Sequence, residues 1–102
     1  MVTRQDLSPG RQIAQSGHAI SQFHLEHPEK SKRWNNSYLI SLSIGTENKL
    51  QTLLTKLNDV GVSVSYFTEP DIGDELTSIC FLENPETVRL TSHLPLSLIN
   101  YN

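Results

Sequence analysis

Four side chains that could bind or activate a substrate recur along one stretch near the start of the chain. They are Arg11, Gln15, His18 and Gln22, spaced three or four residues apart. At about 100° per residue, this spacing places all four on one stripe of a helix. A guanidinium, two amides and an imidazole can bind phosphate, stabilise an oxyanion and move a proton. The stripe lacks the Glu and Lys pairs of a typical solvated face, so it indicates a functional surface, with a solvated helix face as the alternative.

A helix that carries this stripe is predicted from Pro9 to about His27. Ser8 can cap its first turn, proline is tolerated at the first helical position, and Pro28 prevents its continuation. Small residues on the opposite face would let a neighbouring sheet approach closely. That face, expected to be buried, consists of Ile13, Gly17, Ile20 and Phe23.

Strand-like and helix-like segments alternate along the remaining chain. Strands are predicted at residues 1–4, 38–44, 62–68 and 77–83. A second helix is predicted between a Thr46 cap and Gly61, because leucines recur there at helical spacing. A third begins at Asn84 and Pro85 and ends before Pro95. This order predicts an α/β domain, in which a short link after residue 69 makes the last two strands an antiparallel hairpin.

Composition limits the class of protein. A chain of 102 residues, 36% hydrophobic and 19% charged, fits one ordinary folded domain over residues 1–102. It contains no apolar run of membrane-spanning length and no basic, apolar leader, so we expect a cytoplasmic protein. Cys80 is the only cysteine, which excludes an internal disulfide and a cysteine-rich metal site. We expect its thiol to be buried and inert in a strand.

Charge is unevenly distributed along the chain. The formal net charge of −3 argues against a general nucleic-acid binder. Residues 1–34 nevertheless carry five basic and three acidic groups, whereas residues 69–86 carry six acidic groups and no basic one. Such polarity can guide a phosphate chain to one side of the molecule, although a chance distribution is the alternative in so short a chain.

The run of residues 6–19 resembles the opening motif of the type 2 peptidyl-tRNA hydrolase family. In that motif, Asp-Leu leads through a Gly-containing loop to a Lys and then to Ala-Gln-x-x-His-Ala. Here Asp6 and Leu7, then Arg11, then residues 14–19 occupy these positions. The later Glu-Pro and Ser-Ile-Cys-Phe-Leu segments are more similar to the divergent branch called peptidyl-tRNA hydrolase domain-containing proteins.

The resemblance implies a fold and an activity. The fold would be a three-layer α/β/α arrangement with a small mixed four-stranded sheet. The activity would be hydrolysis of the ester that joins a stalled peptide to the terminal ribose of tRNA, which recycles the tRNA. The partner would then be peptidyl-tRNA, and we expect no cofactor. The sequence leaves the oligomeric state open, a homodimer included.

The resemblance also implies catalytic residues. Gln15 matches the family glutamine, Arg11 occupies the lysine position, and Glu69 is the best match for a family Asp. Arginine keeps the positive charge but cannot act as a base. The family has a Thr four positions after its Asp, where this chain has Gly73.

Several candidates have alternative roles. The 69–75 loop is about four residues shorter than its family counterpart, so Asp71 or Asp74 is an alternative to Glu69 as the catalytic acid. His18 either assists proton transfer or has a structural role near Asp6. Asp6 itself more readily caps or ties its loop than attacks a substrate. The substrate-binding set is Asp6, Gln22, Lys30, Lys32 and Arg33.

A basic patch follows the first helix. Lys30, Lys32 and Arg33 stand beside Trp34, a combination that can contact RNA phosphates and stack a base. The alternative is a polar surface loop that is held by one packed tryptophan.

Metal binding is not expected. The histidines at positions 18, 24 and 27 lack zinc-site spacing, and no cysteine completes a set. The acidic 69–75 loop lacks the length and ligand spacing of a calcium loop. The sequence thus favours a peptidyl-tRNA esterase, and the alternative is a catalytically weak or inactive tRNA- or protein-binding module of the same fold.

Overall fold

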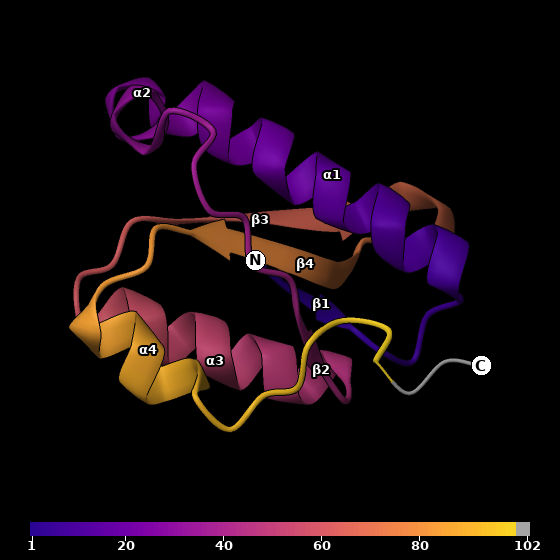
Figure 1. The fold of residues 1–102 in the computed structure, drawn as a ribbon. Coiled ribbons are helices and arrows are strands. Elements are labelled where there is room, and N and C mark those ends of the chain that lie inside the picture. The colour runs from indigo at the N-terminus through magenta and orange to yellow at the C-terminus, as the bar shows by residue number, and fades with distance from the viewer. Residues whose placement is uncertain (100–102) are drawn as a thin grey trace.

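The computed structural model describes residues 1–99, and these form three layers (Figure 1). One layer consists of helices α1 (Pro9–Glu26) and α2 (Pro28–Trp34), and the other of α3 (Glu47–Asp59) and α4 (Pro85–Thr91). A four-stranded sheet lies between them. No helix within residues 1–99 has the length and apolar character needed to cross a membrane.

The sheet is mixed. Its strands are β1 (Val2–Arg4), β2 (Leu42–Ile44), β3 (Val64–Glu69) and β4 (Glu75–Phe81), in the spatial order β2-β1-β4-β3. β1 and β2 are parallel, whereas β4 is antiparallel to both of its neighbours. A short 3-10 helix, η1 (Pro70–Ile72), lies in the β3–β4 turn. The predicted α/β class, mixed four-stranded sheet and terminal hairpin are confirmed.

Local sequence signals define most helix boundaries. Ser8, Thr46 and Asn84 cap α1, α3 and α4, because each side chain accepts a backbone N–H of the first turn. Pro28 ends α1 as predicted, but it also occupies the first turn of α2. The basic patch lies in α2 and is therefore helical. A polar surface loop is the alternative that the sequence alone leaves open for this stretch.

The predicted 38–44 strand is much shorter in the structure. β2 contains only three residues, because its partner β1 offers only three for pairing. Tyr38, Leu39 and Ile40 precede it as exposed chain. The outer edge of β2 is bonded by the C-terminal segment, where Ser43 N donates to Pro95 O. The strands predicted at 62–68 and 77–83 are shifted to Val64–Glu69 and Glu75–Phe81.

The two faces of the sheet differ in chemistry. The face under α3 forms the apolar core, which consists of Val2, Ile44, Leu50, Leu53, Leu57, Leu76 and Ile79. The face under α1 is rich in buried hydroxyls, namely those of Thr3, Ser65, Thr77 and Ser78. The helix α1 therefore packs on polar groups, and it buries polar side chains in return.

This polar packing overturns the predicted core face of α1. Ile13 is 66% exposed, Gly17 is exposed and Ile20 is only partly buried, so Phe23 is the one residue of that set in the core. Outside α1 itself, no atom lies within 4 Å of the position that a Cβ would take at Gly17, so this glycine is not needed for a close approach of the sheet. The buried residues are instead Gln12, Gln15, Ser16, Ala19 and Phe23.

An irregularity in the hairpin places two hydroxyls on the α1 face. Phe67 pairs with Ser78, but the next residue, Thr68, pairs with Leu76, which leaves Thr77 as an extra residue in β4. Such a β-bulge interrupts the alternation of side chains between the two faces. Thr77 consequently bonds to Gln15 of α1, and Ser78 bonds to Thr3 of β1, whose hydroxyl contacts Ser16 of α1. Leu76 on the other side faces the core.

Candidate active site

Three side chains from three elements form a hydrogen-bonded chain at the carboxyl end of β3. Gln15 Nε2 donates to Glu69 Oε2 at 2.9 Å, and Thr77 Oγ1 donates to Gln15 Oε1 at 2.7 Å. Gln15 is 6% exposed and Thr77 is fully buried, whereas Glu69 is partly exposed. The amide of Gln15 therefore connects a buried hydroxyl to a carboxylate that solvent can reach.

Glu69 is held in its ionised form. The hydrogen bond from Gln15 is the largest cause of a pKa below the ordinary value of a glutamate, and the backbone N–H of Asp71 and the charge of His18 add to it. The Asp71 N–H lies 3.3 Å from Glu69 Oε1. Glu69 is thus an acceptor that can hold a water molecule.

His18 and Arg11 flank Gln15 on α1, each about one turn away. The imidazole of His18 stacks on Phe67 of β3, with ring centroids 4.2 Å apart and an interplanar angle of 10°. Its face is packed, but the residue is exposed to solvent. Arg11 is also exposed, and within residues 1–99 its guanidinium makes no hydrogen bond or ion pair. It is available to an anionic ligand.

Arg4 ties together the two loops beside this chain. Its guanidinium donates to both carboxylate oxygens of Asp6, at 2.9 Å each, and to Glu75 Oε1 at 2.7 Å. These bonds lower the pKa of Asp6 and raise that of Arg4. Of the alternatives for Asp6, the structure thus shows a loop tie, which joins the β1–α1 loop to the start of β4.

Other polar contacts fix α1 on the sheet. Gln12 Nε2 donates to Leu7 O at 2.7 Å, which holds the loop before the helix. The Thr3 hydroxyl lies 2.7 Å from those of both Ser16 and Ser78. These bonds satisfy buried hydroxyls between the helix and the sheet. They leave Gln15 on a helix with little freedom to shift.

The β3–β4 turn carries the remaining acidic candidates. Gly73 ends η1 with a φ of 74°, a left-handed conformation that suits glycine, and Asp74 follows with a φ of 58°. Asp71 and Asp74 are both exposed. The hydroxyl that the family resemblance implies after Glu69 is absent at Gly73, and Thr77 supplies a hydroxyl to Gln15 instead.

Thr77 is the site residue that sequence reasoning missed. The sequence places it only in a strand, because nothing in the local pattern indicates a bulge. Gln15, Glu69 and His18 are predicted site residues, and the structure brings all three together. The spacing of residues along the α1 stripe is a usable signal for Gln15, but it gives no sign that this side chain is buried.

The other predicted substrate contacts lie elsewhere. Gln22 donates to Glu26 at 2.8 Å, about two turns beyond Gln15 along α1. Lys30, Lys32 and Arg33 lie on α2, beyond the far end of that helix. Lys32 is 3.7 Å from Glu29 in an exposed ion pair. The structure therefore separates these residues from the Gln15–Glu69 pair.

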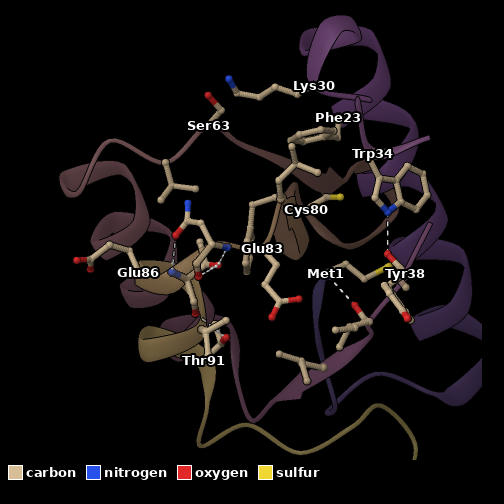
Figure 2. A pocket seen from close by; sticks show the side chains of 18 of the residues that line it. Met1, Phe23, Lys30, Trp34, Tyr38, Ser63, Cys80, Glu83, Glu86 and Thr91 are labelled. Carbon is tan, nitrogen blue, oxygen red and sulfur yellow. Dashed lines mark hydrogen bonds between the residues drawn. The ribbon is translucent and has the colours of Figure 1, made fainter. Parts of the chain in front are cut away.

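A groove of about 1050 Å³ opens at the opposite end of the sheet. Figure 2 shows Trp34 and Tyr38 on one wall and Glu86 on the other, with Cys80 between them. Trp34 Nε1 donates to Tyr38 O at 2.7 Å, so the tryptophan holds the loop after α2. The Cys80 thiol is partly rather than fully buried, and this burial raises its pKa.

Neither metal geometry nor sequence comparison adds to this picture. Within residues 1–99, no group of three His, Cys, Asp or Glu side chains is arranged to hold a metal ion. Comparison with models of known protein families gives no match for this chain, and comparison with curated proteins gives none either.

Proposed function

We propose that this protein hydrolyses the ester bond of peptidyl-tRNA and releases free tRNA. The observation that carries the proposal is the bond from Gln15 to Glu69, made beside the exposed Arg11 and His18. These are the residues that match the opening motif and the acidic position of type 2 peptidyl-tRNA hydrolases. Glu69 is distant in sequence from the three residues of α1, and the fold brings its carboxylate to the Gln15 amide, which lies about one helical turn from the Arg11 cation and the His18 imidazole.

The groups suit ester hydrolysis by water. Glu69 accepts a hydrogen bond from the attacking water and orients it toward the carbonyl carbon. Within residues 1–99, Gln15 Nε2 uses one of its two hydrogens on Glu69, so the second can donate to the developing oxyanion. Arg11 can stabilise the same oxyanion or a phosphate of the tRNA.

Proton transfer falls to His18 in this scheme. The lowered pKa of Glu69 makes its carboxylate a weak base, whereas an imidazole can both accept and donate a proton near neutral pH. Water loses its proton to His18 as the new carbon–oxygen bond forms. His18 then returns the proton to the ribose oxygen as the ester bond breaks. This yields a free ribose hydroxyl and a peptide carboxylic acid, which loses its remaining proton to solvent and becomes a carboxylate.

Glu69 is preferred to Asp71 as the residue that orients water. The Asp71 side chain is exposed in the turn, and its backbone N–H supports the Glu69 carboxylate. Asp74 lies further along the same turn. Among the acidic residues of the described turn, only Glu69 is hydrogen-bonded to the α1 stripe, through Gln15.

A tRNA- or protein-binding module is the second candidate function. Gly73 stands where the family threonine is expected, and Gln15 and Glu69 satisfy one another in the free protein. A domain with this arrangement can keep the binding surface and turn over its ligand very slowly. The two candidates differ in turnover, so one assay separates them.

The test is incubation of the pure protein with N-acetyl-aminoacyl-tRNA, with release of free tRNA as the measurement. We expect Gln15→Ala to lower kcat/KM by about 10²- to 10³-fold, as for loss of an oxyanion donor. Arg11→Ala should also lower kcat/KM. Gln51→Ala, an exposed glutamine of α3, is the matched control and should leave turnover unchanged.

Two outcomes contradict the esterase. Binding without turnover at high protein concentration leaves the module as the function. Binding that does not weaken as salt rises removes the tRNA link as well, because neutralising phosphates makes affinity depend on salt.

A further inference from the structure

We infer that Thr77, which the bulge in β4 places beneath α1, is a positioning residue that fixes the orientation of the Gln15 amide. This inference rests on the proposed function, because the amide matters there as the donor to Glu69 and to the substrate. Thr77 touches Gln15 and the backbone of Phe67, and it acts through Gln15.

An amide side chain can be rotated by half a turn with little change in shape, so its partners decide its orientation. Thr77 Oγ1 lies 2.7 Å from Gln15 Oε1 and 3.2 Å from the Phe67 carbonyl oxygen, and its single hydrogen favours the shorter contact. Rotation of the amide would turn Gln15 Oε1 toward the Glu69 carboxylate. Two acceptors would then face each other.

Thr77 adds a second constraint to the one from Glu69. Without its hydroxyl, Gln15 Oε1 would have no donor in a buried position, which costs free energy. The amide would then relax toward other partners, and the bond to Glu69 would weaken. With the hydroxyl in place, Gln15 Oε1 keeps a donor in its buried position when a substrate or water competes for Glu69.

The bulge is what makes this contact available. In a regular strand, adjacent residues face opposite sides of the sheet, so either Thr77 or Ser78 could lie on the α1 face but not both. Here Ser78 bonds to Thr3 and Thr77 bonds to Gln15. Both hydroxyl residues are fully buried. The bulge therefore lets Ser78 make a structural contact with Thr3 while Thr77 makes the contact with Gln15 in the site.

Apart from Gln15, only a few groups near Glu69 could change the pKa of its carboxyl. His18 faces it from α1, and Asp71 supports it from η1. Glu75 is its register partner in β4, but Arg4 pairs with that carboxylate. Within residues 1–99, none of these side chains is hydrogen-bonded to Thr77, so a change in the pKa of Glu69 in a Thr77 variant would act through Gln15.

The experiment compares Thr77→Val with Thr77→Ser. Valine keeps the shape and removes the hydroxyl, whereas serine keeps the hydroxyl. Carboxyl NMR titration of Glu69 is the first readout. We expect its pKa to rise toward the ordinary glutamate value in Thr77→Val and to stay lowered in Thr77→Ser. The second readout is turnover, which should fall about tenfold in kcat with little change in KM for valine.

Ser78→Ala is the matched control, because it removes the neighbouring buried hydroxyl without touching Gln15. It should lower stability and leave both the Glu69 titration and kcat unchanged. An unchanged Glu69 titration in a folded Thr77→Val protein would overturn the inference, and so would an equal change in Ser78→Ala. The titration needs no substrate. If the wild-type protein lacks turnover, the proposed function fails, yet the titration still decides the role of Thr77.

Discussion

The carboxylates around the candidate site differ in their partners, and the partner decides what each can do. Glu69 bonds to a neutral amide, so it keeps its negative charge and a surface that water can reach. Asp6 bonds through both oxygens to the buried Arg4, which neutralises its charge and fixes its position. Among the acidic residues that the sequence assigns to the site, Glu69 has the contacts of a functional residue and Asp6 those of a structural one.

Asp6→Asn should lower the free energy of unfolding at pH 7. The Arg4–Asp6 bonds are charge-assisted but the Asp6 side chain is 41% exposed, so screening limits the reduction to about 1–2 kcal/mol. The folded state lowers the pKa of Asp6, so its contribution is present above the ordinary value of 3.8 and disappears as pH falls through the folded value. Urea unfolding of both proteins from pH 7 to pH 2.5 measures this.

The gap in stability between wild type and Asp6→Asn should therefore close on the acidic side. Asp59→Asn, an exposed change at the end of α3, is the control and should shift stability by less than about 0.5 kcal/mol. A gap that stays constant across this pH range would show that the Asp6 charge is not what stabilises the loop.

At the scale of elements, α1 and β3 run in opposite directions and meet in three matched contacts. Glu26 accepts from Ser65, His18 stacks on Phe67, and Gln15 bonds to Glu69. Alternate residues of β3 thus face the helix, so the helix fixes where each site residue lies. The site is the last of these contacts, at the carboxyl end of the strand.

The framework of elements can be predicted from the sequence except for α2, but the buried face of α1 cannot. Caps and prolines define the helix ends, and leucine spacing in α3 correctly predicts the apolar core. The predicted buried face of α1 is wrong, because periodicity arguments assume that apolar residues are buried and here the facing strands offer hydroxyls. The stripe position of Gln15 is correct, yet Gln15 is buried. The Thr77 contact depends on a bulge and thus on strand pairing, which local sequence does not encode.

Leucine substitutions test which helix faces are buried. Leu57 on α3 is fully buried, so Leu57→Ala should cost about 2–5 kcal/mol in the free energy of unfolding. Leu25 on α1 is 77% exposed, so Leu25→Ala is a matched control with an expected change below about 0.5 kcal/mol. Ile13→Ala should behave like the control. Urea unfolding followed by circular dichroism gives the three values, and a large cost at Ile13 would show that this residue is buried after all.

At the scale of the whole molecule, charge is divided between the helical layers and the turn. The α1–α2 layer carries Arg11 near the site and Lys30, Lys32 and Arg33 at the other end, whereas the 69–75 turn is acidic. The 18 residues of α1 span about 27 Å at 1.5 Å per residue, and the two basic regions lie near opposite ends of this helix. The proposed tRNA substrate is long enough to contact both, and an acidic turn would keep its backbone on the helical side.

A variant with alanine at Lys30, Lys32 and Arg33 should weaken tRNA binding without changing the chemical step. We expect a higher KM for N-acetyl-aminoacyl-tRNA, an unchanged kcat, and a salt dependence that is shallower by about 0.7–0.9 for each phosphate that the variant no longer neutralises. The control is the double change Lys49→Ala and Lys56→Ala on α3, which removes exposed positive charge from the opposite layer. A fall in kcat would place α2 in the reaction itself, and an unchanged KM and salt slope would confine the tRNA-binding surface to the Arg11 end of α1.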